Sequence, residues 1–158
     1  MTKAEFAQRA LMCQDKLFRM AYLSLRSYAD CQDAVQEALL KAWTKRDSLK
    51  HEEYFDTWLI RILLNVIKDQ YRRSARGQLQ PLIDNQAADM EPLNTDLRDA
   101  VRALDEKLRT PLLLKYISGY SVDETARMLH ITPAQVRWRL EVGKKRLKEQ
   151  LGDKEEGI

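Results

Sequence analysis

Two amphipathic helical segments separated by a short break, within residues 121–151, constrain the fold of this chain most strongly. Ser121 is followed three positions later by Glu124, which is the spacing of a capping box at the start of a helix. The break at 130–132 (His-Ile-Thr) is followed by Pro133, a residue that favours the first turn of a new helix. We therefore predict a short helix, a tight turn and a longer helix that ends near residue 151.

Each of these two helices has one apolar face. The first carries Val122, Ala126 and Leu129, and the second repeats apolar or small residues at spacings of four, three, four and four: Val136, Leu140, Gly143, Leu147 and Leu151. Gly143 would let a neighbouring helix approach closely. His130 stands where such turns need a left-handed residue, a conformation that histidine tolerates better than most residues. This layout predicts a helix-turn-helix, whose second helix enters the major groove of DNA.

The face opposite the apolar one suits duplex DNA. Arginine can bond guanine bidentately and glutamine can bond adenine, whereas lysines further along the helix suit phosphates. An exposed Trp138 indicates contact with DNA, another domain or a partner protein. The alternative is a helical hairpin with a solvated basic face. The candidate DNA-contacting residues are Thr132, Ala134, Gln135, Arg137, Trp138, Arg139, Lys144 and Lys145.

The composition favours helices and excludes several classes of protein. Five Gly and four Pro are few for 158 residues, and no apolar run approaches the roughly 20 residues of a membrane span. The polar N-terminus has no signal-peptide core, which indicates a cytoplasmic protein with no membrane insertion. Cys13 and Cys31 lack the number and spacing of a disulfide framework or a metal site, so we expect packing thiols. We predict an all-α fold of two small helical domains, the first with three to four helices.

Residues 76–96 interrupt the helical periodicity. They contain Gly77, Pro81 and Pro92, and carry one basic and four acidic residues. The flanking segments 1–75 and 97–158 each carry 13 basic and 10 acidic residues. This pattern predicts a flexible acidic linker between an N-terminal domain, 1–75, and a helix-turn-helix domain, 97–152.

Apolar periodicity and capping residues predict the other helices. Before the linker, they run from about Phe6 to Leu25, from a cap at Asp30 to about Lys45, and from a cap at Asp56 or Thr57 to about Arg73. After it, one helix contains Val101, Leu104 and Leu108, and the next begins at Thr110-Pro111 and ends at Gly119.

The helix near residues 57–73 is apolar on all but one narrow stripe, which is formed by Arg61, Asn65, Lys68 and Arg72. Aromatic residues gather just before this stripe, and aromatics beside Arg and Lys suit stacking on unpaired bases. The alternative is that these aromatics belong to the core. The candidate residues for single-stranded DNA are Tyr54, Phe55, Trp58, Arg61, Asn65, Lys68, Arg72 and Arg73.

The helix near residues 30–45 has an outer face of a different kind. That face carries Asp33, Gln36, Glu37 and Leu40, with Trp43 at its border. A leucine exposed among carboxylates indicates a protein-binding patch. One alternative is a solvated acidic face. Another is a metal-dependent nucleic-acid enzyme that uses Asp33 and Glu37 with Asp30, although no histidine lies nearby. We expect no metal and no cofactor.

Three segments, in this order, resemble the extracytoplasmic-function sigma factors, the promoter-recognition subunits of bacterial RNA polymerase. Residues 30–38 are similar to the family's Asp-Ala-Glu-Asp-Leu-Val-Gln-Glu stretch. Residues 55–73 are similar to its Trp-Leu…Ile…Asn…Asp…Arg-Arg helix, and residues 112–140 to its C-terminal domain. The sequence departs from the family at Trp138, usually a small residue, at Val142, often Arg, and at Thr125, usually Ile.

The resemblance implies a binding subunit with no active site of its own, which binds core RNA polymerase and directs promoter-specific initiation. The acidic face with Asp33, Gln36, Glu37, Leu40 and Trp43 would dock on the β′ clamp helices. The loop at 47–55 and the basic stripe would capture the melted −10 element with a base flipped out. The last helix would read the −35 element, the linker would thread the polymerase cleft, and the β flap would be a further contact.

The resemblance also implies control by an anti-sigma factor, which in such families is often membrane-tethered. The alternative function is a stand-alone helix-turn-helix regulator with a helical sensor or dimerisation domain. Such a regulator would bind duplex promoter DNA tightly without polymerase.

Overall fold

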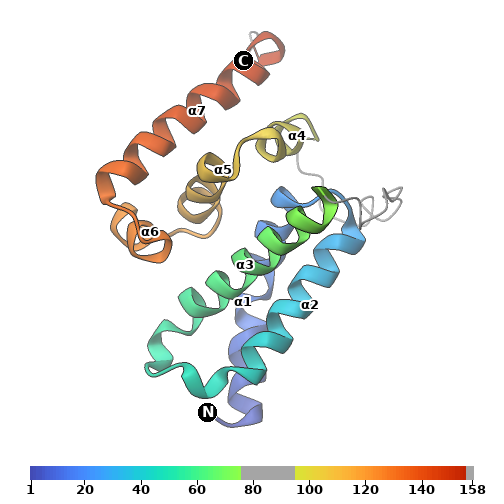
Figure 1. The fold of residues 1–158 in the computed structure, drawn as a ribbon, viewed down its shortest axis with the longest axis vertical. Coiled ribbons are helices and arrows are strands. Elements are labelled where there is room, and N and C mark those ends of the chain that lie inside the picture. Colours follow the sequence, from blue (N-terminus) through green and yellow to red (C-terminus); the bar gives the residue numbers. More distant parts are fainter. Residues whose placement is uncertain (76–94, 156–158) are drawn as a thin grey trace. The chain divides into compact units, whose positions relative to one another are not determined.

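A computed structural model describes residues 1–75 and 95–155 (Figure 1). All regular secondary structure in these two ranges is helical, and the chain forms two compact units, residues 1–87 and 88–158. The predicted all-α, two-domain architecture is confirmed. Most of the predicted linker lies outside the described residues, but its last two positions, Thr95 and Asp96, already belong to a helix.

Residues 1–75 of the first unit form three long helices, α1 (Lys3–Ser24), α2 (Tyr28–Thr44) and α3 (Phe55–Ala75), with the 3₁₀ turns η1 (Arg46–Ser48) and η2 (Glu52–Tyr54) between α2 and α3. All three helices pack on one another. The core contains Leu17, Met20, Leu59, Leu63 and Val66. Ala34, Ala38 and Ala42 are also buried, and these small residues on α2 allow close helix packing.

The starts of α2 and α3 differ from the prediction. Ser27, not Asp30, caps α2: its hydroxyl accepts a hydrogen bond of 3.0 Å from the amide of Asp30. Asp30 lies in the first turn, where its charge favours the helix N-terminus. Helix α3 begins at Phe55 instead of after Asp56 or Thr57, because it follows directly from η2.

The second unit contains α4 (Thr95–Ala103), α5 (Glu106–Leu112), the π-helical segment η4 (Leu113–Ile117), α6 (Val122–Leu129) and α7 (Pro133–Glu155). The predicted helix start at Thr110-Pro111 is wrong. Helix α5 begins after Asp105 and carries Pro111 inside it. Leu104 lies between α4 and α5, so the fourth predicted helix is two helices.

The helix-turn-helix is confirmed. Ser121 and Glu124 form the capping box, with hydrogen bonds of 2.9 and 3.1 Å. His130 has φ 58° and ψ 43°, the left-handed conformation expected for the turn. The hydrophobic core beneath the helix-turn-helix contains Leu104, Leu112, Ala126, Val136 and Leu140. In the two described ranges, no helix has both the length and the apolar character that a membrane span requires.

Candidate nucleic-acid and protein interfaces

The acidic face of α2 lies on the surface as expected. Asp33 and Gln36 are exposed, Glu37 is half-buried, and Leu40 is 68% exposed. Trp43 is only half-exposed. Its ring packs edge-on against Phe6 at 5.2 Å between centroids, and the Arg46 guanidinium lies 3.8 Å from the ring centroid. Leu40 is therefore the main apolar group that this face offers to a partner.

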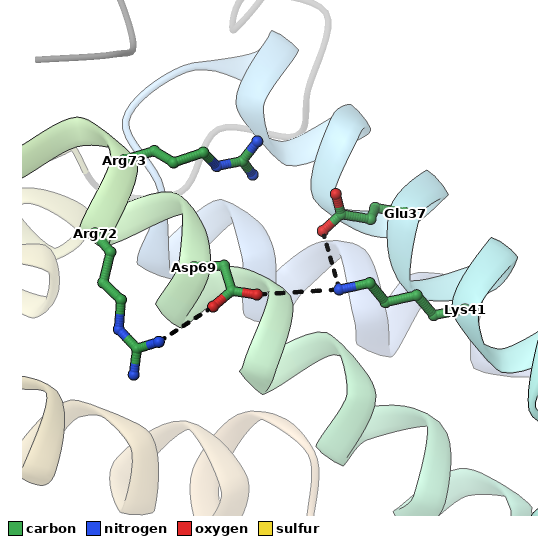
Figure 2. A pocket seen from close by; sticks show the side chains of 5 residues that line it. All are labelled: Glu37, Lys41, Asp69, Arg72 and Arg73. Atoms are coloured by element: carbon green, nitrogen blue, oxygen red, sulfur yellow. Dashed lines mark hydrogen bonds and ion pairs between the residues drawn. The ribbon is translucent and has the colours of Figure 1, made fainter. Parts of the chain in front are cut away.

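A chain of ion pairs joins this face to the C-terminal half of α3 (Figure 2). Lys41 lies 3.7 Å from the Glu37 carboxylate and 4.0 Å from that of Asp69, and Asp69 lies 3.4 Å from Arg72. These four residues and Arg73 line an open pocket between the two helices. The acidic face and the basic end of α3 are thus neighbouring parts of one surface.

A second pocket contains a residue that the sequence analysis missed. It is lined by Asp30, Asp33, Gln36, Glu37, Leu40, Gln70 and Arg73. Gln70 is buried, and its Nε2 donates a 3.4 Å hydrogen bond to the main-chain oxygen of Asp30. The spacing of Gln70 from Leu63 and Val66 places it on the buried face, so periodicity could have found it. No group of three His, Cys, Asp or Glu side chains in residues 1–75 and 95–155 could hold a metal ion.

The basic stripe of α3 is exposed along its length, as predicted for Arg61, Asn65, Lys68 and Arg72. The three aromatic residues before it lie in different environments. Tyr54 is 58% exposed and its ring lies 6.1 Å from that of His51. Trp58 is half-buried. Phe55 is only 2% exposed and packs edge-on against Phe6 at 5.5 Å, so its ring is part of the core.

The N-terminus of α7 also has a capping box, which the sequence analysis missed. The Thr132 hydroxyl accepts a hydrogen bond of 3.1 Å from the main-chain amide of Gln135. In return, the side-chain oxygen Oε1 of Gln135 accepts one of 2.9 Å from the main-chain amide of Thr132. The Thr-x-x-Gln spacing was visible in the sequence. In this box the Gln135 oxygen already accepts one hydrogen bond, so a bidentate contact to adenine would have to use its second lone pair.

The other candidate residues of α7 lie mostly on the surface. Ala134, Arg137, Lys144 and Lys145 are exposed, Arg139 is half-buried, and Trp138 is 64% exposed.

Tyr116 of η4 is a neighbour of the α7 surface that the sequence analysis did not predict. The Nζ of Lys144 lies 4.9 Å from the centroid of its ring. A hydrogen bond to the Tyr116 side chain raises the pKa of Lys144.

Two family models match the chain. The Sigma-70 region 2 family matches residues 11–77, and the Sigma-70 region 4 family matches residues 94–147. The ECF RNA polymerase sigma factor SigM of Mycobacterium tuberculosis is 30% identical over 148 residues, which cover 90% of this chain and 75% of the relative. SigW of Bacillus subtilis, also an ECF RNA polymerase sigma factor, is 26% identical over 170 residues, which cover 94% and 89%.

The fold is also similar to that of a solved sigma factor. RpoE from Bartonella quintana, in complex with the anti-sigma factor NepR, matches with a TM-score of 0.80 and 26% identity, covering 94% of this chain and 97% of that one. A region 2 unit followed by a region 4 unit defines a sigma-70 type transcription initiation factor. The chain belongs to the extracytoplasmic-function sigma factors, which direct RNA polymerase to promoters by recognising −10 and −35 elements. This is a family of initiation factors and not of enzymes.

Proposed function

We propose that the chain performs this function through three surfaces, on α2, α3 and α7, and that it has no catalytic site of its own. The observation that carries the proposal is that each of these helices exposes one surface whose charge suits a particular partner. The α2 surface is acidic with one exposed leucine, whereas the α3 and α7 surfaces are basic. All three lie within the segments that match the sigma-70 regions.

The α2 surface would bind core polymerase, on the β′ clamp helices. Leu40 would supply the apolar contact, and Asp33, Gln36 and Glu37 would accept hydrogen bonds from basic and polar groups around it. Trp43 would contribute from the rim, because Phe6 and Arg46 already contact its ring.

The α3 surface would capture the melted −10 element. Tyr54 is the exposed ring on which a flipped base can stack, with Trp58 at the border of the same surface. Arg61, Lys68, Arg72 and Arg73 would contact phosphates, and Asn65 can bond a base edge. Phe55 would support this surface from the core.

The N-terminal end of α7 would enter the major groove of the −35 element. Arg137 would bond a base, Ala134 would allow close approach, and Lys144 and Lys145 would contact phosphates. Thr132 and Gln135 would fix the end of the helix through their capping box. Trp138 and Arg139 complete the surface, with Trp138 offering apolar contact in the groove.

We also propose that an anti-sigma factor covers these surfaces when the protein is inactive. In one similar solved structure the sigma factor RpoE is bound to the anti-sigma factor NepR, and in another CnrH is bound to the cytosolic domain of CnrY. Exposed Leu40 and Trp138 are apolar groups that a protein partner would shield.

The test is reconstitution with core RNA polymerase. The wild-type chain should co-elute with core enzyme and support run-off transcription from its promoter. Asp33→Lys with Glu37→Lys should abolish both, because like charges would then meet the basic partner surface. Asp15→Lys, an exposed change on α1, is the charge control. If the double variant still co-elutes like the wild type, the α2 surface is not the docking site.

A further inference from the structure

One face of α1 contacts the junction between η2 and α3. This face carries Phe6, Arg9, Cys13 and Lys16, at spacings of three, four and three residues. Phe6 packs on Phe55, while Cys13 and Lys16 both contact the carboxylate of Asp56, at 3.0 and 3.6 Å. Three successive turns of α1 therefore hold the segment on which Tyr54 stands.

Arg9 contacts η2 itself. Its Nη1 donates a 2.8 Å hydrogen bond to the main-chain oxygen of Glu52, and its Nη2 lies 3.4 Å from the Glu52 carboxylate. The same main-chain oxygen accepts the amide of Phe55. A carbonyl oxygen has two lone pairs and can accept both bonds. Arg9 thus ties α1 to the backbone of η2.

The turn η2 has few hydrogen bonds of its own to stabilise it. It is only three residues long, with the His51 oxygen accepting the amide of Tyr54 at 3.0 Å. A short 3₁₀ turn is intrinsically weak, because few hydrogen bonds offset the order imposed on its backbone. A fixed external donor therefore has a large share in keeping its conformation.

We infer that Arg9 is a positioning residue for −10 capture, which holds η2 through the Glu52 main-chain oxygen so that Tyr54 is presented to a base. The inference rests on the proposed role of Tyr54. A ring that is already in place before DNA binds loses less conformational entropy on binding. Arginine suits this role because its planar guanidinium presents donors in a fixed fork that reaches the main-chain oxygen and the carboxylate together, whereas the lysine ammonium is a point charge on a flexible stem.

The experiment compares four full-length variants, each assembled into holoenzyme with core polymerase. They are Arg9→Gln, Glu52→Gln, Tyr54→Ala and, as a matched control on the same helix, Arg19→Gln. Fluorescence anisotropy measures the affinity of each holoenzyme for a labelled single-stranded −10 oligonucleotide. Core-enzyme affinity, −35 duplex binding and the unfolding midpoint are measured alongside, since a general structural role would change these too.

We expect Arg9→Gln to weaken −10 binding roughly three- to tenfold, the range of one ordinary net hydrogen bond. Glu52→Gln keeps the main-chain oxygen and loses only the ion pairs of the carboxylate with Arg9 and with the Met1 amino group, so its affinity should stay within about twofold of the wild type. Arg19→Gln should bind as the wild type does, and the three other measurements should not change for Arg9→Gln.

Each contrary result has a separate meaning. If Tyr54→Ala binds the oligonucleotide as tightly as the wild type, the proposed −10 surface fails and the inference with it. If Tyr54→Ala weakens binding but Arg9→Gln does not, only the role of Arg9 is overturned. If Glu52→Gln loses as much as Arg9→Gln, the carboxylate and not the main-chain oxygen carries the effect, which also overturns the inference.

Discussion

Arg109 donates a hydrogen bond of 2.8 Å to the main-chain oxygen of Leu104, directly after the end of α4. It also donates to the oxygen of Arg102 at 3.3 Å. Arg109 is buried, and its guanidinium satisfies carbonyl groups at the C-terminus of α4 that lie beyond the intrahelical hydrogen bonds. This contact joins α4 to α5.

Replacing Arg109 by Leu should therefore destabilise the second unit. Leucine replaces the aliphatic part of the arginine side chain but leaves the Leu104 oxygen without its donor, which costs about 1–3 kcal/mol. Urea unfolding of the full chain measures the effect. Lys107→Leu, at an exposed position of the same helix, is the control and should change the free energy of unfolding little.

Replacing Gly143 by Val should destabilise the packing of α7 on α5. A Cβ at this position would lie 2.8 Å from Leu112 Cδ1 and 3.6 Å from the oxygen of Leu108. Overpacking of this kind costs about 1–3 kcal/mol. Gly152→Val is the matched control on the same helix, because a Cβ there meets no atom within 4 Å. Equal unfolding midpoints for the two variants would contradict the prediction.

Replacing Thr125 by Val should stabilise the helix-turn-helix. Thr125 is fully buried, and its hydroxyl oxygen has no hydrogen-bond partner. Valine has the same shape without the unpaired polar group, so we expect a gain of about 1 kcal/mol in the free energy of unfolding. Thr125→Ser keeps the hydroxyl and loses a methyl group, so it should lower stability in the same thermal unfolding measurement.

Stability should fall at high pH through Cys13. Burial, with the hydrogen bond to Asp56, raises the pKa of Cys13 from 9.0 to about 12. Above pH 9 the thiol ionises in the unfolded chain but not in the folded one. Its contribution to stability is therefore complete below pH 9 and lost as the pH rises toward 12. The stability difference between the wild type and Cys13→Ala should shrink over this range in urea unfolding. Parallel curves would contradict the assignment.

Replacing Arg137 by Ala should weaken −35 recognition at one base position. A bidentate base contact contributes about 1–3 kcal/mol of discrimination. The measurement is holoenzyme binding to duplexes that vary each base of the element in turn. Lys145→Ala should instead weaken binding uniformly and reduce its salt dependence. A uniform loss for Arg137→Ala would make Arg137 a phosphate contact.

The sequence by itself determined the local architecture. The capping box at Ser121, the left-handed turn at His130 and the exposed stripe of α3 all depend on residues a few positions apart, because caps, turns and helical periodicity are set by the nearby backbone. The same is true of Thr132 and Gln135, although their capping box was not recognised. Local signals failed at Thr110-Pro111, where α5 had already begun after Asp105.

Only the tertiary structure decided which side chains of those helices are exposed and which are buried or held by another helix. Tyr54 and Phe55 are adjacent aromatics, and Phe6 of α1 decides that Phe55 is buried while Tyr54 remains exposed. Arg9 reaches Glu52 across 43 positions of sequence, and Gly143 matters because Leu112 lies against it. Such contacts depend on how whole helices pack, and the spacing of residues along one helix cannot specify what lies against its face.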